Sequence, residues 1–293
     1  MNITVISLWD YAGAGQHIAN AVNRVGRHQA SFIRQGVKPK EPASNEQVAT
    51  VADADIIHIK GDEPLWKFDK IMATAYGVNS FHDFGKPLIL SVEGSTFRRR
   101  IYNLADYAET PLTALTADLA LPEYNALYTP QGIDSESLPN IWQMGDPPFI
   151  SHSPSNRATK GTALLLEAMP YFDIDIIEGV PLAECIQRKA TSTLFFDQCL
   201  TGYYGYAALE AGAMGIPFAA WLPDYAIEQA GGLLDDHPVI NCGQSPEWIR
   251  RTLLDALEGD MAELSKRTKA FIDRVHSYSV VGNMWSNIYE GLV

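Results

Sequence analysis

The sequence has few cysteines and no long hydrophobic run, and each absence narrows the class of protein. Its three cysteines, Cys185, Cys199 and Cys242, are odd in number and lack the spacing of a metal site, so we expect reduced thiols in the core. No run of about 18 apolar residues is present, so we expect no transmembrane helix. The N-terminal residues lack the basic region of a signal peptide. We therefore expect a cytoplasmic protein without a transmembrane segment.

Positive charge is also scarce. The chain has 22 lysines and arginines against 35 aspartates and glutamates, which gives a formal net charge of −13. A chain with this charge repels nucleic acids and anionic lipids on average. A local basic patch can override the average, and the run Arg98-Arg99-Arg100 is a candidate for one.

Strands and helices alternate along the chain, and the pattern restarts after a short linker at 143–148. The length of 293 residues suits two domains, and the apolar fraction of 46% is that of a globular protein. Apolar segments predict strands at 2–8, 28–34, 55–60, 87–92, 113–116, 126–128, 149–153, 173–178, 193–196 and from 217 onward. Helical patterns lie at 16–25, 66–76, 160–169, 181–190, 207–214, 246–257, 261–276 and 282–289. The alternation predicts α/β domains with parallel sheets covered by helices on both faces.

The stretch 201–221 predicts a loop, a helix and a strand. Gly202 and Gly205 bracket two tyrosines in the loop, and strong helix formers follow as far as Gly215. A helix that begins at the carboxyl end of a strand directs free N–H groups at a crevice, where they can hold a phosphate. Glu210 lies on the first turns of this helix, where its carboxylate can accept hydrogen bonds from two neighbouring hydroxyls, as on a ribose.

Two further segments follow strands and precede helices. Arg157 and Lys160 are three residues apart, and two cations beside a helix N-terminus suit a diphosphate. A solvated basic turn explains them equally well on their own, and the nearby Glu210 helix favours the ligand. Gly13 and Gly15 lie in a loop of the kind that approaches phosphates, although a tight turn without a ligand fits as well.

Together these motifs resemble the retaining GT-B glycosyltransferases of family four, which take a sugar from a nucleotide diphosphate. The specific part of the resemblance is Arg157-x-x-Lys160-Gly161-Thr162, followed by Gly205-x-x-x-x-Glu210-Ala211-x-Ala213-x-Gly215-x-Pro217. Less specific similarities are Gly13 and Gly15, the strand 55–58, Gly94-Ser95-x-x-Arg98, Gly132-Ile133-Asp134 and the last helix around 285–289.

The resemblance implies an α/β fold of two Rossmann-like domains that face a cleft. Residues 1–145 would form the acceptor domain, 146–276 the nucleotide-sugar domain, and 277–293 a helix that crosses back to the first domain. The implied activity is metal-independent hexosyl transfer with retention of the anomeric configuration. The implied partners are a nucleotide-sugar donor and an acceptor that is a glycan, a lipid, a protein or a nucleic acid. No cofactor is implied.

By position in the resembling motifs, Arg157 and Lys160 would stabilise the departing diphosphate. The implied donor-binding residues are Gly13, Gly15, Gly205, Tyr206, Ala207 and Glu210, of which Glu210 would hold the ribose hydroxyls. The N–H groups of Tyr206 and Ala207 would meet the distal phosphate.

Two positions depart from the family's pattern. Gly202 stands where the family often has a glutamate that touches the donor sugar, and Glu93 stands where it often has a histidine. Glu93 is a candidate catalytic residue that acts as a base or orients the acceptor, or it caps a nearby backbone or pairs with Arg98. Arg98 itself is an acceptor-side candidate or part of a solvated charge run. A binding protein without efficient transfer and a sugar-nucleotide epimerase are the alternative functions.

Polar residues at other strand ends have structural interpretations. We expect His58 and His152 to be hydrogen-bonded structural histidines, since neither has the company of metal ligands. Asp197 and Gln198 either line the donor pocket or cap the loop that follows them.

Overall fold

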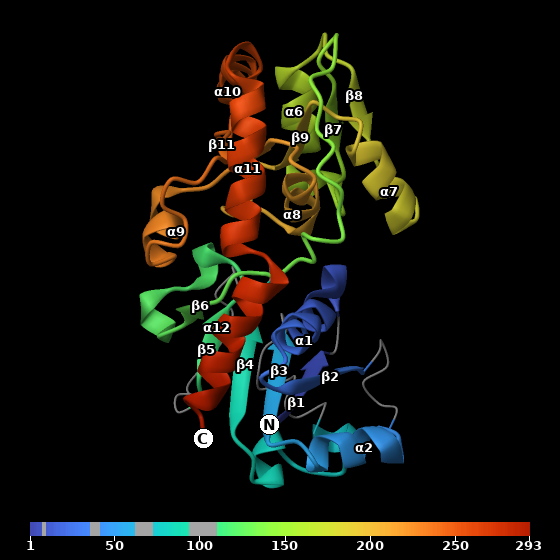
Figure 1. The fold of residues 1–293 in the computed structure, drawn as a ribbon, viewed down its shortest axis with the longest axis vertical. Coiled ribbons are helices and arrows are strands. Elements are labelled where there is room, and N and C mark those ends of the chain that lie inside the picture. The colour runs from blue at the N-terminus through green and yellow to red at the C-terminus, as the bar shows by residue number, and fades with distance from the viewer. Residues whose placement is uncertain (8–9, 36–41, 62–72, 94–109) are drawn as a thin grey trace. The chain divides into compact units, whose positions relative to one another are not determined.

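The computed structural model describes residues 1–7, 10–35, 42–61, 73–93 and 110–293 of the chain (Figure 1). These residues divide into two compact units. The N-terminal unit comprises Met1–Gly132 and Tyr278–Val293, and the C-terminal unit comprises Ile133–Ser277. The first unit therefore includes the last residues of the chain. In the described parts, no helix has the length and hydropathy to cross a membrane.

A parallel sheet forms the centre of the N-terminal unit. Among the described residues it has six strands in the order β2-β1-β3-β4-β5-β6. They are β1 (Asn2–Ser7), β2 (Gln29–Arg34), β3 (Ile56–Gly61), β4 (Leu88–Val92), β5 (Leu112–Ala114) and β6 (Leu127–Tyr128). Every residue of β3 and β4 is buried, as expected for central strands that are covered on both faces.

Local capping signals define the first helices of this unit. Helix α1 (Ala14–Val25) ends at Gly26, whose φ of 75° suits glycine. Helix α2 (Asn45–Ala52) begins with a capping box in which the side chains and backbone N–H groups of Ser44 and Gln47 bond reciprocally. Helix α2 is absent from the helices predicted by hydrophobic pattern, because only one of its residues, Val51, is buried.

The last helix, α12 (Tyr278–Glu290), belongs to the N-terminal unit and lies beside α1 (Figure 1). The two helices approach closely at Gly282, where a Cβ would lie 2.0 Å from the carbonyl oxygen of Ala21. Tyr289 is fully buried and its hydroxyl lies 2.7 Å from Nδ1 of His58, whose Nε2 lies 2.6 Å from the hydroxyl of Ser91. Burial lowers the pKa of His58 to about 3, so the imidazole is neutral. The expected structural histidine therefore joins α12 to the sheet.

The C-terminal unit, all of which is described, has a parallel sheet of five strands in the order β11-β10-β9-β7-β8. The strands are β7 (Ile150–His152), β8 (Ile174–Ile176), β9 (Leu194–Gln198), β10 (Phe218–Ala220) and β11 (Ile240–Asn241). The helices are α5 (Arg157–Lys160), α6 (Thr162–Ala168), α7 (Leu182–Lys189), α8 (Tyr206–Ala213), α9 (Asp224–Gln229), α10 (Pro246–Glu258) and α11 (Met261–Val275). The core cluster contains Cys199 and Cys242, which are free and buried as expected, whereas Cys185 is free but only partly buried and is not part of this cluster.

One predicted helix is divided in the structure, and another lies largely outside the described residues. The predicted helix 160–169 is divided into α5 and α6 by Gly161, which has a φ of 75°. A Cβ at Gly161 would lie 2.2 Å from Sγ of Cys199. Only glycine therefore fits where the chain bends against the core. The predicted helix 66–76 lies largely outside the described residues, which begin again at Ala73.

Candidate functional site

The candidate site lies where β7, β9 and the helices that follow them meet in the C-terminal unit. Asn156 caps α5 by accepting a hydrogen bond from the N–H of Thr159 at 3.1 Å. Lys160 is the last residue of this short helix, and the left-handed Gly161 follows it. The close contact between Gly161 and the thiol of Cys199 fixes the backbone beside Lys160. The local cap at Asn156 and the long-range contact with Cys199 together fix the position of the Lys160 backbone.

Asp197, near the end of β9, joins Lys160 to the start of α8. Its Oδ1 accepts a hydrogen bond from Nζ of Lys160 at 2.9 Å, and its Oδ2 accepts one from the backbone N–H of Gly205 at 2.7 Å. A Cβ at Gly205 would lie 3.4 Å from Nζ of Lys160. The structure therefore brings the Lys160 ammonium to the beginning of the Glu210 helix. Asp197 caps the loop, one of its two predicted roles, and also pairs with the lysine.

Helix α8 has no side-chain cap at its N-terminus among the described residues. The N–H groups of Ala208 and Leu209 bond the carbonyl of Gly205. The first turn, which includes the predicted donor-binding residues Tyr206 and Ala207, carries the positive end of the helix dipole. An ammonium and a helix N-terminus side by side make a place that favours a phosphate group.

Glu210 is paired with a lysine that the sequence analysis missed. Lys189, the last residue of α7, donates from Nζ to Oε2 of Glu210. The Lys189 side chain is only 1% exposed, whereas that of Glu210 is 18% exposed. A lysine near the end of an amphipathic helix ordinarily points to solvent, so its sequence carries no signal for this inward contact.

Arg157 forms a separate ion pair with Glu178, which follows β8. Its Nε lies 2.9 Å from Oε2 of Glu178, and one terminal nitrogen lies 2.6 Å from the same oxygen. The pairing raises the pKa of Arg157 and lowers the pKa of Glu178, because charge-assisted hydrogen bonds favour both ionised forms. The Arg157 side chain is 57% exposed, in contrast to that of Lys160, which is 19% exposed.

His152 lies beside the candidate site and contacts both β9 and α6. One ring nitrogen lies 2.8 Å from the carbonyl of Phe196 and the other lies 2.8 Å from the hydroxyl of Thr162. Burial is the main cause that lowers the pKa of His152. The neutral imidazole thus connects β9 to the first residue of α6, which confirms the expected structural histidine.

The backbone and surroundings of Gly202 leave no room for the glutamate that the resembling family often has at this position. Its φ of 69° is unfavourable for residues with a Cβ, and a Cβ there would lie 3.1 Å from the hydroxyl of Tyr225. It would also lie 3.6 Å from the rings of Trp221 and Pro223. A glutamate at this position would require a different loop.

In the N-terminal unit, packing and a side-chain hydrogen bond account for the two glycines at the start of α1. The N–H of Gly15 donates to Oδ1 of Asp10 at 2.6 Å. A Cβ at Gly15 would lie 2.5 Å from the ring of Phe32 on β2. Gly13 has a φ of 72°, in the left-handed region, and precedes α1. These contacts agree with the tight turn that the sequence left as one alternative.

Glu93, directly after β4, is buried and forms an ion pair with Lys60 of β3, a lysine the sequence analysis did not single out. Lys60 is fully buried, and Gln131 donates to Oε2 of Glu93 at 3.4 Å. Pairing of a strand-end carboxylate is thus observed, but with Lys60 as the partner. Arg98, the acceptor-side candidate, lies outside the described residues, as do Gly94 and Ser95.

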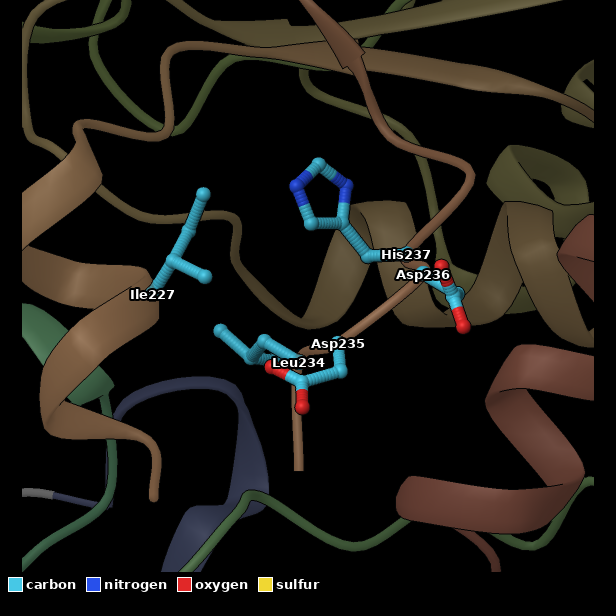
Figure 2. Close-up of a pocket in the computed structure, with 5 residues that line it drawn as sticks. All are labelled: Ile227, Leu234, Asp235, Asp236 and His237. Carbon is cyan, nitrogen blue, oxygen red and sulfur yellow. The ribbon is translucent and has the colours of Figure 1, made fainter. Parts of the chain in front are cut away.

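A pocket of about 450 Å³ lies elsewhere in the C-terminal unit, after α9. Figure 2 shows Leu234 pointing toward Ile227 of α9, with the ring of His237 above them. Asp235 and Asp236 complete its lining. Burial and the charge of Arg267 lower the pKa of His237. None of these lining residues is among the predicted site residues.

No protein-family model matches the chain, and no curated protein does. Solved structures do match. Alr3699/HepE of Anabaena in complex with UDP and glucose is 13% identical, with 100% of both chains covered and a TM-score of 0.66. An α-glucosyltransferase in complex with UDP-glucose and DNA containing an abasic site is 10% identical, with 98% of both chains covered and a TM-score of 0.67. Sucrose-phosphate synthase from Thermosynechococcus elongatus is 10% identical, with 100% of this chain and 99% of that chain covered and a TM-score of 0.66.

These similarities show the fold. The chain has the GT-B glycosyltransferase fold, and the predicted α/β class with parallel sheets flanked by helices is confirmed.

Proposed function

We propose that this protein is a glycosyltransferase that moves a sugar from a nucleoside-diphosphate sugar to an acceptor hydroxyl. The observation that carries the proposal is the Lys160 ammonium, held by Asp197 beside the start of α8. The fold supports it, since solved structures with the same fold hold UDP or UDP-glucose. The membership of family four, the hexosyl group and the retention of configuration are further parts of this proposal.

The proposed chemistry depends on stabilising the leaving group. As the bond from the sugar to the diphosphate breaks, negative charge grows on the phosphate oxygens. The Lys160 ammonium and the N–H groups at the start of α8 stabilise that charge without having to reorganise. In a retaining transfer the acceptor hydroxyl attacks on the side that the diphosphate leaves, and a phosphate oxygen takes its proton. Positioned donors of this kind contribute about 3 kcal/mol each.

The remaining predicted residues have separate roles in the proposal. Glu210 accepts hydrogen bonds from the ribose, and Arg157 exchanges its exposed partner Glu178 for a phosphate oxygen. The Gly13 and Gly15 loop contributes backbone to donor binding. Glu93, which pairs with Lys60, is the proposed catalytic residue that acts as a base or orients the acceptor hydroxyl, and Arg98 is the proposed acceptor-side residue. The proposed reaction uses no metal and no cofactor.

Nucleotide binding and turnover test the proposal. A thermal-shift panel of the uridine, guanosine and adenosine diphosphates and their sugars should show one base that raises the melting temperature, because a ligand bound to the folded state stabilises it. Transfer or hydrolysis of the labelled sugar should then follow. Lys160→Met should lower turnover more than binding, and Glu210→Ala should weaken binding. Lys269→Met, which removes a partly exposed lysine paired with the exposed Asp273, is the matched control.

Two results would contradict parts of the proposal. If no nucleoside diphosphate or nucleotide sugar shifts the melting temperature, the donor site is wrong. If a diphosphate binds but no acceptor supports transfer, the protein is a nucleotide-binding GT-B protein instead. The closed position at Gly202, with Tyr225 against it, is the observation that favours this alternative. Analysis of the product sugar separates both from an epimerase.

A further inference from the structure

Lys189 is an unusual lysine because its side chain is almost completely buried. It is 1% exposed, while its neighbour Arg188 is 34% exposed and pairs with Asp175. Moving an ammonium out of water costs several kcal/mol unless partners compensate for its lost hydration. The contacts of Lys189 at the end of α7 must therefore compensate for the hydration that its ammonium loses.

These contacts surround the ammonium with groups that favour positive charge. Nζ of Lys189 donates to Oε2 of Glu210 and lies 3.5 Å from the carbonyl oxygen of Ala207. It also lies 5.3 Å from the centroid of the Phe195 ring, where a cation is attracted by the aromatic face. Ala207 and Glu210 both belong to α8, so Lys189 holds the first turns of that helix.

The ion pair fixes the orientation of the Glu210 carboxylate and gives one of its two oxygens a partner. Oε2 is occupied by Lys189, and no described residue donates to Oε1. The side chain of Glu210 is 18% exposed, so a ligand can reach the carboxylate. A free glutamate loses side-chain entropy when it is ordered by a ligand. In this protein Lys189 has already ordered it.

We propose that Lys189 is a positioning residue that holds the Glu210 carboxylate for a ribose diol and thereby makes the site select ribonucleotides over 2′-deoxyribonucleotides. The inference rests on the proposed nucleotide site. A carboxylate fixed in one orientation can accept from both ribose hydroxyls. With a 2′-deoxyribose, one of those acceptor positions faces no donor, and an unpaired, partly buried acceptor is costly.

The test compares ribose and 2′-deoxyribose forms of the same nucleoside diphosphate by titration calorimetry. The base is the one that binds the wild-type chain best among uridine, guanosine and adenosine. We expect the wild type to prefer the ribose form by about tenfold or more, since a site built around a hydroxyl rejects the analogue that lacks it. Lys189→Met should reduce the preference toward one. Lys269→Met, which removes a partly exposed lysine elsewhere in the same unit, should keep the wild-type preference.

Removing Lys189 leaves Glu210 without its cation and can prevent folding, so a second variant is needed. Lys189→Gln keeps a hydrogen-bond donor for Oε2 without the charge, and its preference should lie between one and the wild-type value. A wild-type preference in either folded variant overturns the inference, as does a wild-type protein that binds both forms equally. A wild type that binds no nucleoside diphosphate refutes the proposed function itself, which is a different result.

Discussion

Asp197→Asn tests the central contact of the candidate site. The substitution removes one negative charge but keeps a carbonyl oxygen that can accept from the N–H of Gly205. Lys160 loses the partner that now lies 2.9 Å from its ammonium. Because the Asp197 side chain is fully buried and that of Lys160 is 19% exposed, water can replace only part of the lost interaction.

The expected loss of stability follows from this partial burial. Removing one partner of a fully buried ion pair costs about 3–5 kcal/mol. Solvent at Lys160 reduces that to about 1–3 kcal/mol, because exposed pairs contribute about 1 kcal/mol or less. For a unit of this size, the melting temperature should fall by roughly 3–10 °C.

The same variant should bind pyrophosphate more tightly than the wild type. In the wild type the charges of Lys160 and Asp197 cancel, whereas in the variant the ammonium is unopposed. A unit charge about 4 Å away contributes between about 1 kcal/mol in water and about 4 kcal/mol at an effective dielectric constant of 20. The lower value already corresponds to about fivefold in affinity. Turnover should nevertheless fall, because Lys160 is no longer held beside Gly205.

Thermal unfolding and calorimetry with inorganic pyrophosphate measure both effects. Asp273→Asn, which removes the carboxylate of the exposed Lys269 pair, is the control and should change neither. If pyrophosphate stabilises the wild type as much as it stabilises Asp197→Asn, then Lys160 does not face the phosphate site and the reasoning is refuted.

Other substitutions give independent predictions. His58 has a pKa of about 3 when folded and about 6.5 when unfolded, so the unfolded chain binds more protons between these values and stability falls as the pH falls, by up to about 1.4 kcal/mol per pH unit. His58→Gln should reduce the dependence of the unfolding free energy on pH, measured by urea denaturation between pH 5 and 6.5. If the variant keeps the wild-type dependence, buried His58 is not its cause. Gly161→Ala should cost about 2–5 kcal/mol, the sum of left-handed strain and overpacking, whereas Gly179→Ala, at a φ of 66° with no atom within 4 Å, should cost about 1–2 kcal/mol in the same denaturation assay. Arg157→Gln should leave the melting temperature unchanged because its pair with Glu178 is exposed, and should weaken nucleotide binding in calorimetry; equal binding would remove Arg157 from the site.

The sequence was informative where function or fold depends on local pattern. Apolar runs predict the strands of both sheets apart from β11 (Ile240–Asn241), which has only two residues, and α8 follows from its helix formers between Gly205 and Gly215. The break at Gly161 was missed, because the contact with Cys199 that requires it joins segments far apart in the chain. Helix α2 was missed for the opposite reason, since its signal is a local capping box with little hydrophobic pattern.

The ionic partners of the candidate site lay beyond sequence reasoning. Lys160 and Asp197 are 37 residues apart, and Lys189 and Glu210 are 21 apart, so no local periodicity connects either pair. Lysine is by default a surface residue, and a buried one is recognised only when the structure shows its partners. Residue type and position predicted Glu210 and Lys160 as site residues. They could not show that each already forms an ion pair within the protein.

The position of α12 has a consequence for how the chain is made. The N-terminal unit needs residues that leave the ribosome only after the whole C-terminal unit, and among them Trp285 and Tyr289 fill its interior. During synthesis the C-terminal unit can therefore finish folding while the N-terminal unit still lacks helix α12. Until residue 290 emerges, the surface of α1 that receives Gly282 stays open to chaperones and to other nascent chains.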